Sequence, residues 1–325
     1  MRTLFAALLL STILFAQTPK PLPADDGVRI REFYRLADQI QDKIWPGWSK
    51  TPAPLLLVTT DTEYLTQFPT PPKDFQKAGD DTYARPRQFA INMQATFPAF
   101  GFPPVIVIGE PKATSSQTST PWLITVMHEH FHQLQWAQPE YLKAIADLGL
   151  SKGDATGMWM LNYPYPYDNP ELAGAFEHLR DSLLEALSEV EQKKFDQLSK
   201  QYMKDRKQFF AQLLPGDHKY FSFQLWQEGV ARYTQIKSAE AAGDYQPSAE
   251  YAALSDFTPF STYALTARAR TIDELKHIDI TQSKREVFYS FGAAEALLLD
   301  RINPDWKSQY FQHLLTTDPL FSTVR

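Results

Sequence analysis

Residues 118–138 read TSTPWLITVMHEHFHQLQWAQ, and positions 128–132 within them form the pattern H-E-x-x-H. On a helix, residues four apart lie on one face, so His128 and His132 can present two imidazoles to one metal ion. Glu129 lies about 100° round the helix from His128, where it can hold a metal-bound water instead of the metal. A zinc ion would lower the pKa of that water toward about 7, and the water could then attack a carbonyl.

The residues around this pattern predict a helix. Thr120 is a good N-cap residue, and Pro121 suits the first helical position. No other Pro or Gly occurs before Gln138, and the broad apolar surface predicts a mostly buried helix. His130 lies about 200° from His128 and is expected to face away from the metal. The competing interpretation is a pair of core histidines that match the pattern by chance.

A catalytic zinc usually takes three protein ligands and keeps one position for water. The candidate third ligand is Glu228, in the segment 226–233, WQEGVARY. An E-G-x-A-x-Y helix that follows an H-E-x-x-H helix resembles the gluzincin metallopeptidases, whose ligands are two His and a downstream Glu. The resemblance implies one Zn²⁺ per chain, bound by His128, His132 and Glu228, with Glu129 as the general base.

The chain departs from this family in three respects. Ninety-five residues separate His132 from Glu228, more than in the compact members. Arg232 stands where thermolysin-like enzymes carry an Asp, four residues after the Glu ligand. The Gly and third His of the metzincins do not follow His132.

The intervening stretch offers rival third ligands, and these are Glu171, Glu177, His178 and Glu185. All four lie on a predicted amphipathic helix that starts near Pro170. Its charges are typical of a solvated face, so Glu228 is preferred.

The N-terminus predicts export. Arg2 precedes an apolar run from Leu4 to Phe15 that ends at Ala16, and this pattern is typical of a signal peptide over residues 1–16. An uncleaved anchor is the alternative, although the run is short for a bilayer span. Residues 17–27 read as a Pro-rich linker. We therefore expect a bacterial periplasmic or secreted protein without stable membrane insertion after cleavage.

Composition narrows the possible functions. The chain has no cysteine, which excludes disulfides, thiol nucleophiles and thiolate ligands. The net charge of −6 gives no reason to expect nucleic acid as a partner. The expected partner is a peptide or protein substrate.

Residues 28–118 predict a small α/β lobe. We expect a helix over 28–44, a buried strand over 55–60, a short helix over 63–68, and strands over 88–93 and 105–108. In related metallopeptidases such a lobe offers an edge strand to an extended peptide.

Residues 119–325 predict a helical lobe with a helical insertion over about 140–215. Helices over 170–188 and 191–214 should form an antiparallel hairpin, because their connection is short. The aromatic loop 149–169 is expected to pack on the surface, with substrate recognition as the alternative. The Glu228 helix should span 220–241. The predicted fold is α+β and mainly helical, with residues 28–325 forming one zincin-like catalytic domain.

A late segment beginning at Tyr289 is similar to a helix seen late in gluzincin-like chains. Tyr289 is a candidate donor to the oxyanion, with simple packing as the alternative. Tyr233 lies about 140° from Glu228 on its helix and is not expected at the site. The histidines without a motif are predicted to be ordinary surface or loop residues: His218, His277 and His313.

The sequence thus predicts an exported zinc metallopeptidase. Glu129 would deprotonate the attacking water and then protonate the leaving amine. One alternative is a non-catalytic binding protein on the same scaffold, suggested by the long spacing and by Arg232. Another is a hydrolase of non-peptide amides or esters.

Overall fold

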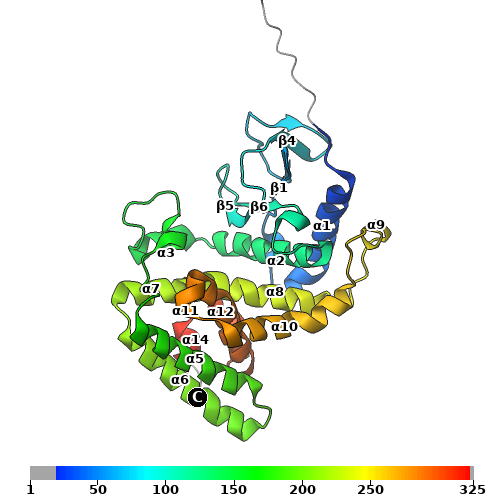
Figure 1. The fold of residues 1–325 in the computed structure, drawn as a ribbon. Coiled ribbons are helices and arrows are strands. Elements are labelled where there is room, and N and C mark those ends of the chain that lie inside the picture. Colours follow the sequence, from blue (N-terminus) through cyan, green and yellow to red (C-terminus); the bar gives the residue numbers. More distant parts are fainter. Residues whose placement is uncertain (1–19, 323–325) are drawn as a thin grey trace, which may run out of the picture.

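The computed structural model describes residues 20–322, so the predicted signal peptide lies outside the described residues. These residues form a small sheet lobe and a larger helical lobe (Figure 1). The strands are β1 (Leu55–Val58), β2 (Thr62–Thr66), β3 (Gln76–Lys77), β4 (Thr82–Pro86), β5 (Gln94–Phe97) and β6 (Val105–Gly109). Their order in the sheet is β3-β4-β2-β1-β6-β5, and β1 and β6 run parallel while the other pairs are antiparallel.

Helices make up most of the rest of the chain. They are α1 (Ala24–Ile44), α2 (Ser119–Trp136), α3 (Tyr141–Leu148), α4 (Trp159–Asn162), α5 (Pro170–Ser188), α6 (Gln192–Gln212), α7 (Pro215–Gln224), α8 (Val230–Ala241), α9 (Ala249–Ala252), α10 (Phe260–His277), α11 (Ile280–Ser283), α12 (Val287–Ile302), α13 (Trp306–Tyr310) and α14 (Asp318–Ser322). Short 3₁₀ turns are η1 (Trp48–Lys50), η2 (Pro111–Ala113) and η4 (Lys284–Glu286), and η3 (Leu225–Gly229) is a π turn. None of the helices within residues 20–322 could span a membrane.

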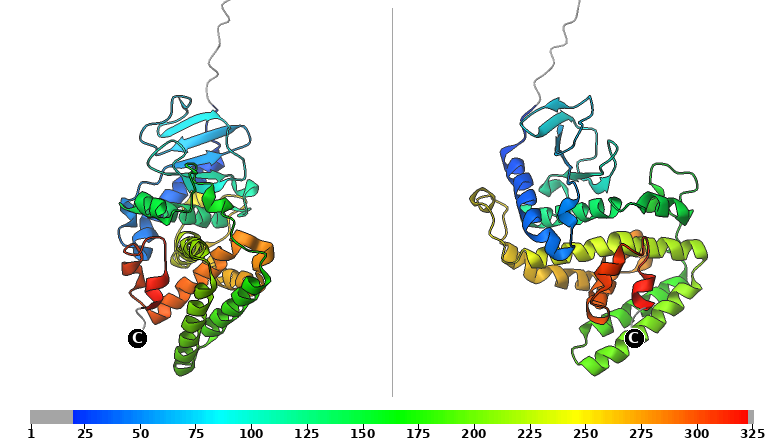
Figure 2. Two further views of the ribbon diagram at one scale, coloured as in Figure 1. Left: turned by 90° about the vertical axis from the view of Figure 1, so that its left-hand side faces the viewer. Right: turned by 180° about the vertical axis from the view of Figure 1, so that it is seen from behind.

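Helix α2 is the layer between the two lobes. The sheet lies above α2 in Figure 1, and the continuous path α7–η3–α8 runs beneath it. Figure 2 shows the same layering from the side and from behind. A large apolar cluster extends from α1 and one face of the sheet through α2 into the helical lobe, while a smaller cluster covers the other face of the sheet. The mixed α+β class expected from the sequence is confirmed.

Two predictions for the sheet lobe are wrong. Residues 62–66 form strand β2 instead of a helix over 63–68, because a short connection folds them back antiparallel on β1. Residues 88–93 form a loop instead of a strand. The buried carboxylate of Glu63 accepts hydrogen bonds from the backbone N–H groups of Gln88 and Phe89. A side chain therefore satisfies the backbone donors that a strand neighbour would otherwise need to satisfy.

Several helix boundaries also differ from expectation. The helical path that carries Glu228 begins at Pro215 instead of residue 220, and Glu228 lies in its π turn η3. Helix α1 begins at Ala24, so the last residues of the predicted linker are helical, and two acidic residues in the first turn favour this start. Helix α2 begins at Ser119 after Thr118 and ends at Trp136. The hydroxyl of Thr120 does not cap the helix but donates to the carbonyl of Thr258, 2.5 Å away.

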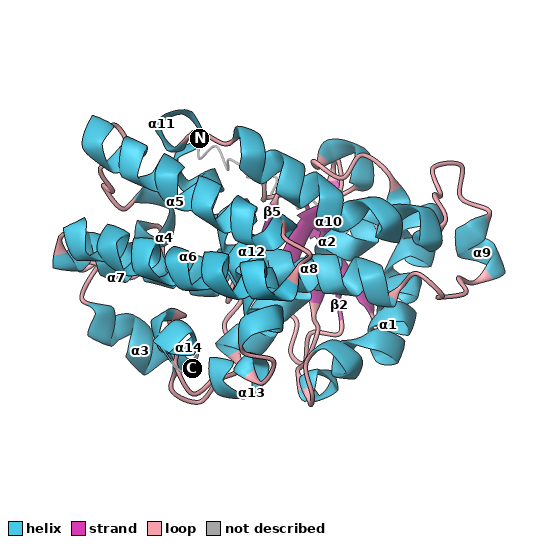
Figure 3. Ribbon diagram, turned by 90° about the horizontal axis from the view of Figure 1, so that it is seen from below, coloured by secondary structure: helices cyan, strands magenta, loops and turns pink. Residues whose placement is uncertain are grey.

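The insertion follows the sequence prediction closely. Helices α5 and α6 pack together as the expected hairpin, and they lie side by side in Figure 3. The aromatic loop packs on α7, because the ring of Tyr163 stacks on Tyr220 with centroids 4.4 Å apart and Tyr165 is buried. The packing interpretation of this loop is therefore the one that the structure supports.

Turn η3 crosses α12 at two glycines. A Cβ atom added to Gly229 would lie 2.5 Å from the Cα atom of Gly292, and one added to Gly292 would lie 2.6 Å from the Cα atom of Gly229. Side-chain carbons do not approach backbone this closely, so only glycine permits the contact. The crossing brings the η3 residue Glu228 beside α12.

We expect Gly229→Ala to destabilise the fold, because the added methyl group forces two backbones apart. Overpacking typically costs about 1–3 kcal/mol, and the free energy of unfolding should fall by at least that amount. Gly174→Ala on α5 is the matched control, since nothing lies within 4 Å of its added Cβ. It should raise the free energy of unfolding by roughly 0.5–1 kcal/mol. Urea unfolding of both variants measures the difference, and equal effects would contradict the close crossing.

Candidate metal centre

Helix α2 presents two histidines toward the helical lobe. The Nε2 atoms of His128 and His132 lie 3.2 Å apart, and each residue is 5% exposed. Two nitrogen ligands at normal zinc distances in a tetrahedron are about 3.3 Å apart. The pair therefore already has the separation that one tetrahedral metal ion requires.

The π turn η3 supplies a third ligand atom. Oε2 of Glu228 lies 3.4 Å from Nε2 of His132 and 3.8 Å from Nε2 of His128. All three ligand atoms lie within 4.8 Å of one another, so the group can hold a metal ion. Two imidazole nitrogens and one carboxylate oxygen are a donor set that zinc accepts. π turns occur frequently at functional sites in helices, and here the turn carries a candidate ligand.

The rival third ligands lie away from this group. All four are exposed on α5: Glu171, Glu177, His178 and Glu185. His178 instead faces Asp205, with Nε2 3.7 Å from Oδ2. Their prediction as a solvated face is confirmed.

A glutamine orients His132. Gln135 donates from Nε2 to the carbonyls of Trp226 and Gln227, 3.0 and 3.1 Å away. Its Oε1 is therefore the acceptor that faces Nδ1 of His132 at 2.6 Å, closer than the donor Nε2 of Gln227, which lies 3.1 Å from the same atom. With the hydrogen on Nδ1, the Nε2 lone pair points at the metal position, as metal-binding histidines usually require. Sequence reasoning missed Gln135, although its position three residues after His132 on one helix is a usable signal.

His128 is held in a different way. Its Nδ1 atom is buried without a hydrogen-bond partner. The ring of Tyr289 stacks on the imidazole instead, with centroids 6.1 Å apart and an interplanar angle of 15°. Ring stacking thus fixes the orientation of His128, while its Nδ1 remains an unsatisfied polar atom.

Glu129 lies next to the ligands but outside their group. Its Oε2 and its backbone carbonyl each lie 2.9 Å from the hydroxyl oxygen of Thr96. Thr96 belongs to β5, which is the edge strand beside α2. The sequence did not single out Thr96, because it lies 33 residues before Glu129.

Arg285 is the third residue near the centre that the sequence analysis missed. One guanidinium nitrogen lies 3.4 Å from Oε1 of Glu228, and another donates to the hydroxyl of Tyr289 at 3.0 Å. Burial alone would raise the pKa of Glu228. The charge on His132, hydrogen bonds from both histidines and the charge on Arg285 outweigh burial and hold that pKa well below its usual range.

The two histidines differ in proton affinity. Burial lowers the pKa of His128, because the charged form loses its hydration. Burial opposes charge on His132 too, but the carboxylate of Glu228 outweighs it and raises the pKa of His132 to about 9. The metal-free site therefore keeps one proton on His132 at neutral pH.

The remaining candidates lie elsewhere, as expected. His130 is buried and faces away from the ligands, because its ring nitrogens meet Gln41 and Gln133. Tyr233 donates its hydroxyl to Asp300. Three histidines lie outside the group as well: His277 is exposed, and His218 and His313 are partly exposed.

No protein-family model, curated protein or solved structure matches the chain. The functional argument therefore depends on the geometry of this centre.

We expect the purified protein to bind about one zinc ion per chain, the usual count for such a site. His128→Ala or His132→Ala should abolish binding, and Glu228→Ala should weaken it severely. Glu171→Ala and Glu177→Ala are controls on the exposed face of α5 and should retain zinc. Elemental analysis after dialysis measures the metal. Zinc retention by Glu228→Ala would remove Glu228 from the ligand set.

Zinc binding should release protons. Because the pKa of His132 is raised to about 9 in the metal-free site, zinc must displace about one proton at neutral pH. The apparent affinity should therefore rise with pH and level off above about pH 9. Calorimetry in buffers of different ionisation enthalpy counts the released protons. Release of no proton at neutral pH would show that His132 is uncharged before binding.

Proposed function

We propose that the protein is an exported zinc-dependent metallopeptidase with a zincin-like fold of the gluzincin type. The main support is the convergence of His128, His132 and Glu228 within 4.8 Å, with Glu129 adjacent on the same helix. The order of the two motifs along the chain supports the same family.

A bound zinc ion would supply Lewis acidity toward a carbonyl oxygen and toward a water molecule. The role of the chain is then proton transfer. We assign Glu129 as the base that accepts a proton from the attacking water and returns it to the leaving amine. Thr96 would keep the Glu129 carboxylate in place through its 2.9 Å hydrogen bond.

Tyr289 is suited to stabilise the oxyanion of the substrate. Its hydroxyl oxygen already accepts from Arg285, so its own hydrogen can be donated to a substrate. Burial raises the pKa of Tyr289 well above its usual value, and the nearby Glu228 raises it further. The phenol therefore stays protonated, as a hydrogen-bond donor to developing charge must.

Strand β5 gives the proposed substrate a place to bind. It pairs with β6 on one side and forms an edge of the sheet. An extended peptide could add to that edge by backbone hydrogen bonds. Because Thr96 on β5 contacts Glu129, such a peptide would lie close to the proposed base.

One observation favours the non-catalytic alternative. Arg285 lies against Glu228, and a guanidinium there competes with a metal ion for the charge of the carboxylate. Peptide cleavage by the wild-type protein separates the two functions. Cleavage of an ester or a non-peptide amide alone would instead indicate the second alternative.

We expect Glu129→Gln to retain zinc and the fold but to lose activity by roughly 10²–10⁴-fold, the usual contribution of a general base. The amide preserves the size of the side chain and removes only its basicity. Zinc by elemental analysis and cleavage of a peptide library by mass spectrometry are measured side by side with the wild type. Unchanged cleavage by Glu129→Gln would disprove the assigned role of this residue.

A further inference from the structure

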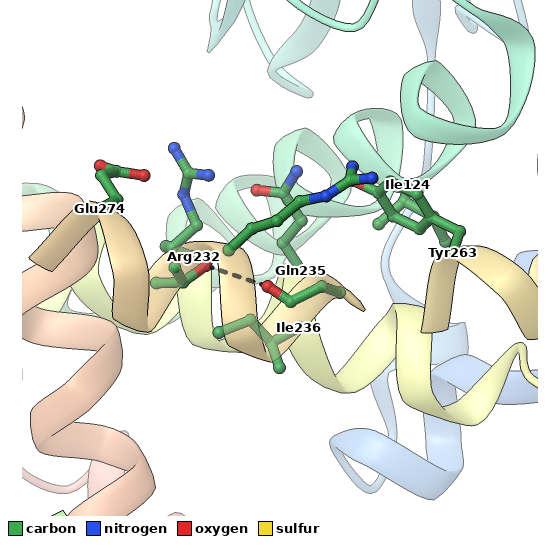
Figure 4. A pocket seen from close by; sticks show the side chains of 9 residues that line it. Ile124, Arg232, Gln235, Ile236, Tyr263 and Glu274 are labelled. Carbon is green, nitrogen blue, oxygen red and sulfur yellow. Dashed lines mark hydrogen bonds between the residues drawn. The ribbon is translucent and has the colours of Figure 1, made fainter. Parts of the chain in front are cut away.

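A pocket lies in the helical lobe, near the candidate metal centre. It is lined by residues of α2, α8 and α10, and Figure 4 shows these side chains. Its buried apolar part includes Ile124 and Ile236. Its polar residues include Arg232 and Arg270, one from each of the two facing helices. The pocket thus combines an apolar base with two guanidinium groups.

The two arginines have no anionic partner within residues 20–322. Nε of Arg232 is buried without a hydrogen-bond partner. The guanidinium of Arg232 lies 5.6 Å from the ring centroid of Tyr289, and that of Arg270 lies 5.3 Å from the ring centroid of Tyr263. A buried unpaired donor costs roughly 1–3 kcal/mol. By contrast, Arg268, on the same helix as Arg270, forms an ion pair with Glu240.

The pocket lies about one helical turn from the metal ligands on both helices that carry them. Ile124 precedes His128 by four residues on α2, and Arg232 follows Glu228 by four residues. One turn corresponds to about 5.4 Å along a helix. Tyr289 connects the two places, because its ring contacts both His128 and Arg232. A ligand in the pocket would therefore lie about one helical turn from the metal position, on the far side of the Tyr289 ring from His128.

Charge identifies the class of ligand. The chain as a whole carries a net charge of −6, yet this pocket presents two unpaired cations. The one carboxylate among its lining residues, Glu274, is exposed and lies at the Arg232 end of the pocket, away from Tyr263 (Figure 4). No ion pair within residues 20–322 joins it to either arginine. A guanidinium binds a carboxylate through two parallel hydrogen bonds, and one of the available donors here is the buried, unpaired Nε of Arg232.

We propose that this pocket binds a carboxylate of the substrate, next to the bond that is cut. The assignment of the ligand as a substrate rests on the proposed peptidase function. The carboxylate can be the C-terminus of a peptide or the side chain of Asp or Glu. In either case Arg232 and Arg270 hold the charge, and the apolar base of the pocket contacts the adjoining carbon atoms.

The test measures binding of uncleaved probes to the metal-free protein, so that no carboxylate can bind zinc. N-acetyl-leucine and N-acetyl-leucinamide differ only in the charge of their C-terminal group. The 1-amide of N-acetyl-glutamate and N-acetyl-glutaminamide differ only in the charge of the side chain. Affinities are measured by ligand-observed NMR for the wild type, Arg232→Gln, Arg270→Gln and the control Arg268→Gln.

The wild type should prefer one acid over its matched amide by roughly tenfold or more, as expected for hydrogen bonds to a charged group. The preferred pair identifies the C-terminus or the side chain as the source. Arg232→Gln and Arg270→Gln should remove most of the preference, while Arg268→Gln should keep it. Arg270 is exposed, so its variant remains informative if Arg232→Gln fails to fold.

Equal binding of acid and amide in both pairs would overturn the proposal. So would a preference that is unaffected by Arg270→Gln and by a folded Arg232→Gln. Neither zinc nor cleavage enters the measurement. A failure of peptidase activity therefore leaves the carboxylate result intact, and a failure here leaves the role of Glu129 untouched.

Discussion

The contact between Gly229 and Gly292 sets the distance between η3 and α12, because their backbones touch with no side chain between them. Glu228 directly precedes one of these glycines, and Tyr289 lies three residues before the other. The same close crossing therefore positions the third candidate ligand and the aromatic ring that stacks on His128. A larger residue at either glycine would move both groups relative to α2. The geometry of the centre thus depends on the absence of two side chains.

The second constraint is electrostatic. His128, His132 and Glu228 are held together in a largely buried position, where an unpaired charge would be costly. In the metal-free protein, the positive charge of protonated His132 compensates the carboxylate charge of Glu228. Arg285 lies against Oε1 of the same carboxylate. A metal ion would replace that proton without rearranging the side chains. The three side chains are therefore already in place before metal binding, so that binding costs little free energy for ordering them.

The group of His128, His132 and Glu228 could be predicted from sequence, because the two histidines share one helix and Glu228 lies in a segment that resembles the second gluzincin motif. The four-residue spacing of His128 and His132 brings both side chains to one face only if the segment is a helix. The run from Ser119 to Trp136 is helical. The contacts of Arg285 and Thr96 join residues 57 and 33 positions apart in the chain, and no motif marks them. The loop over residues 88–93 was mistaken for a strand for a similar reason: its backbone donors are satisfied by a distant side chain.

The long spacing between the two motifs has a structural role. The residues between α2 and α7 include the α5–α6 hairpin, and α5 packs on α12, which carries Tyr289. The insertion therefore supports one wall of the candidate centre, which gives its length a structural reason. Arg232 is then the main remaining departure from the gluzincin pattern. Arg232 places a cation at the adjoining pocket, and Nδ1 of His128 has no hydrogen-bond partner. Arg232 thus supplies part of the charge that, in the proposed pocket, would bind a substrate carboxylate.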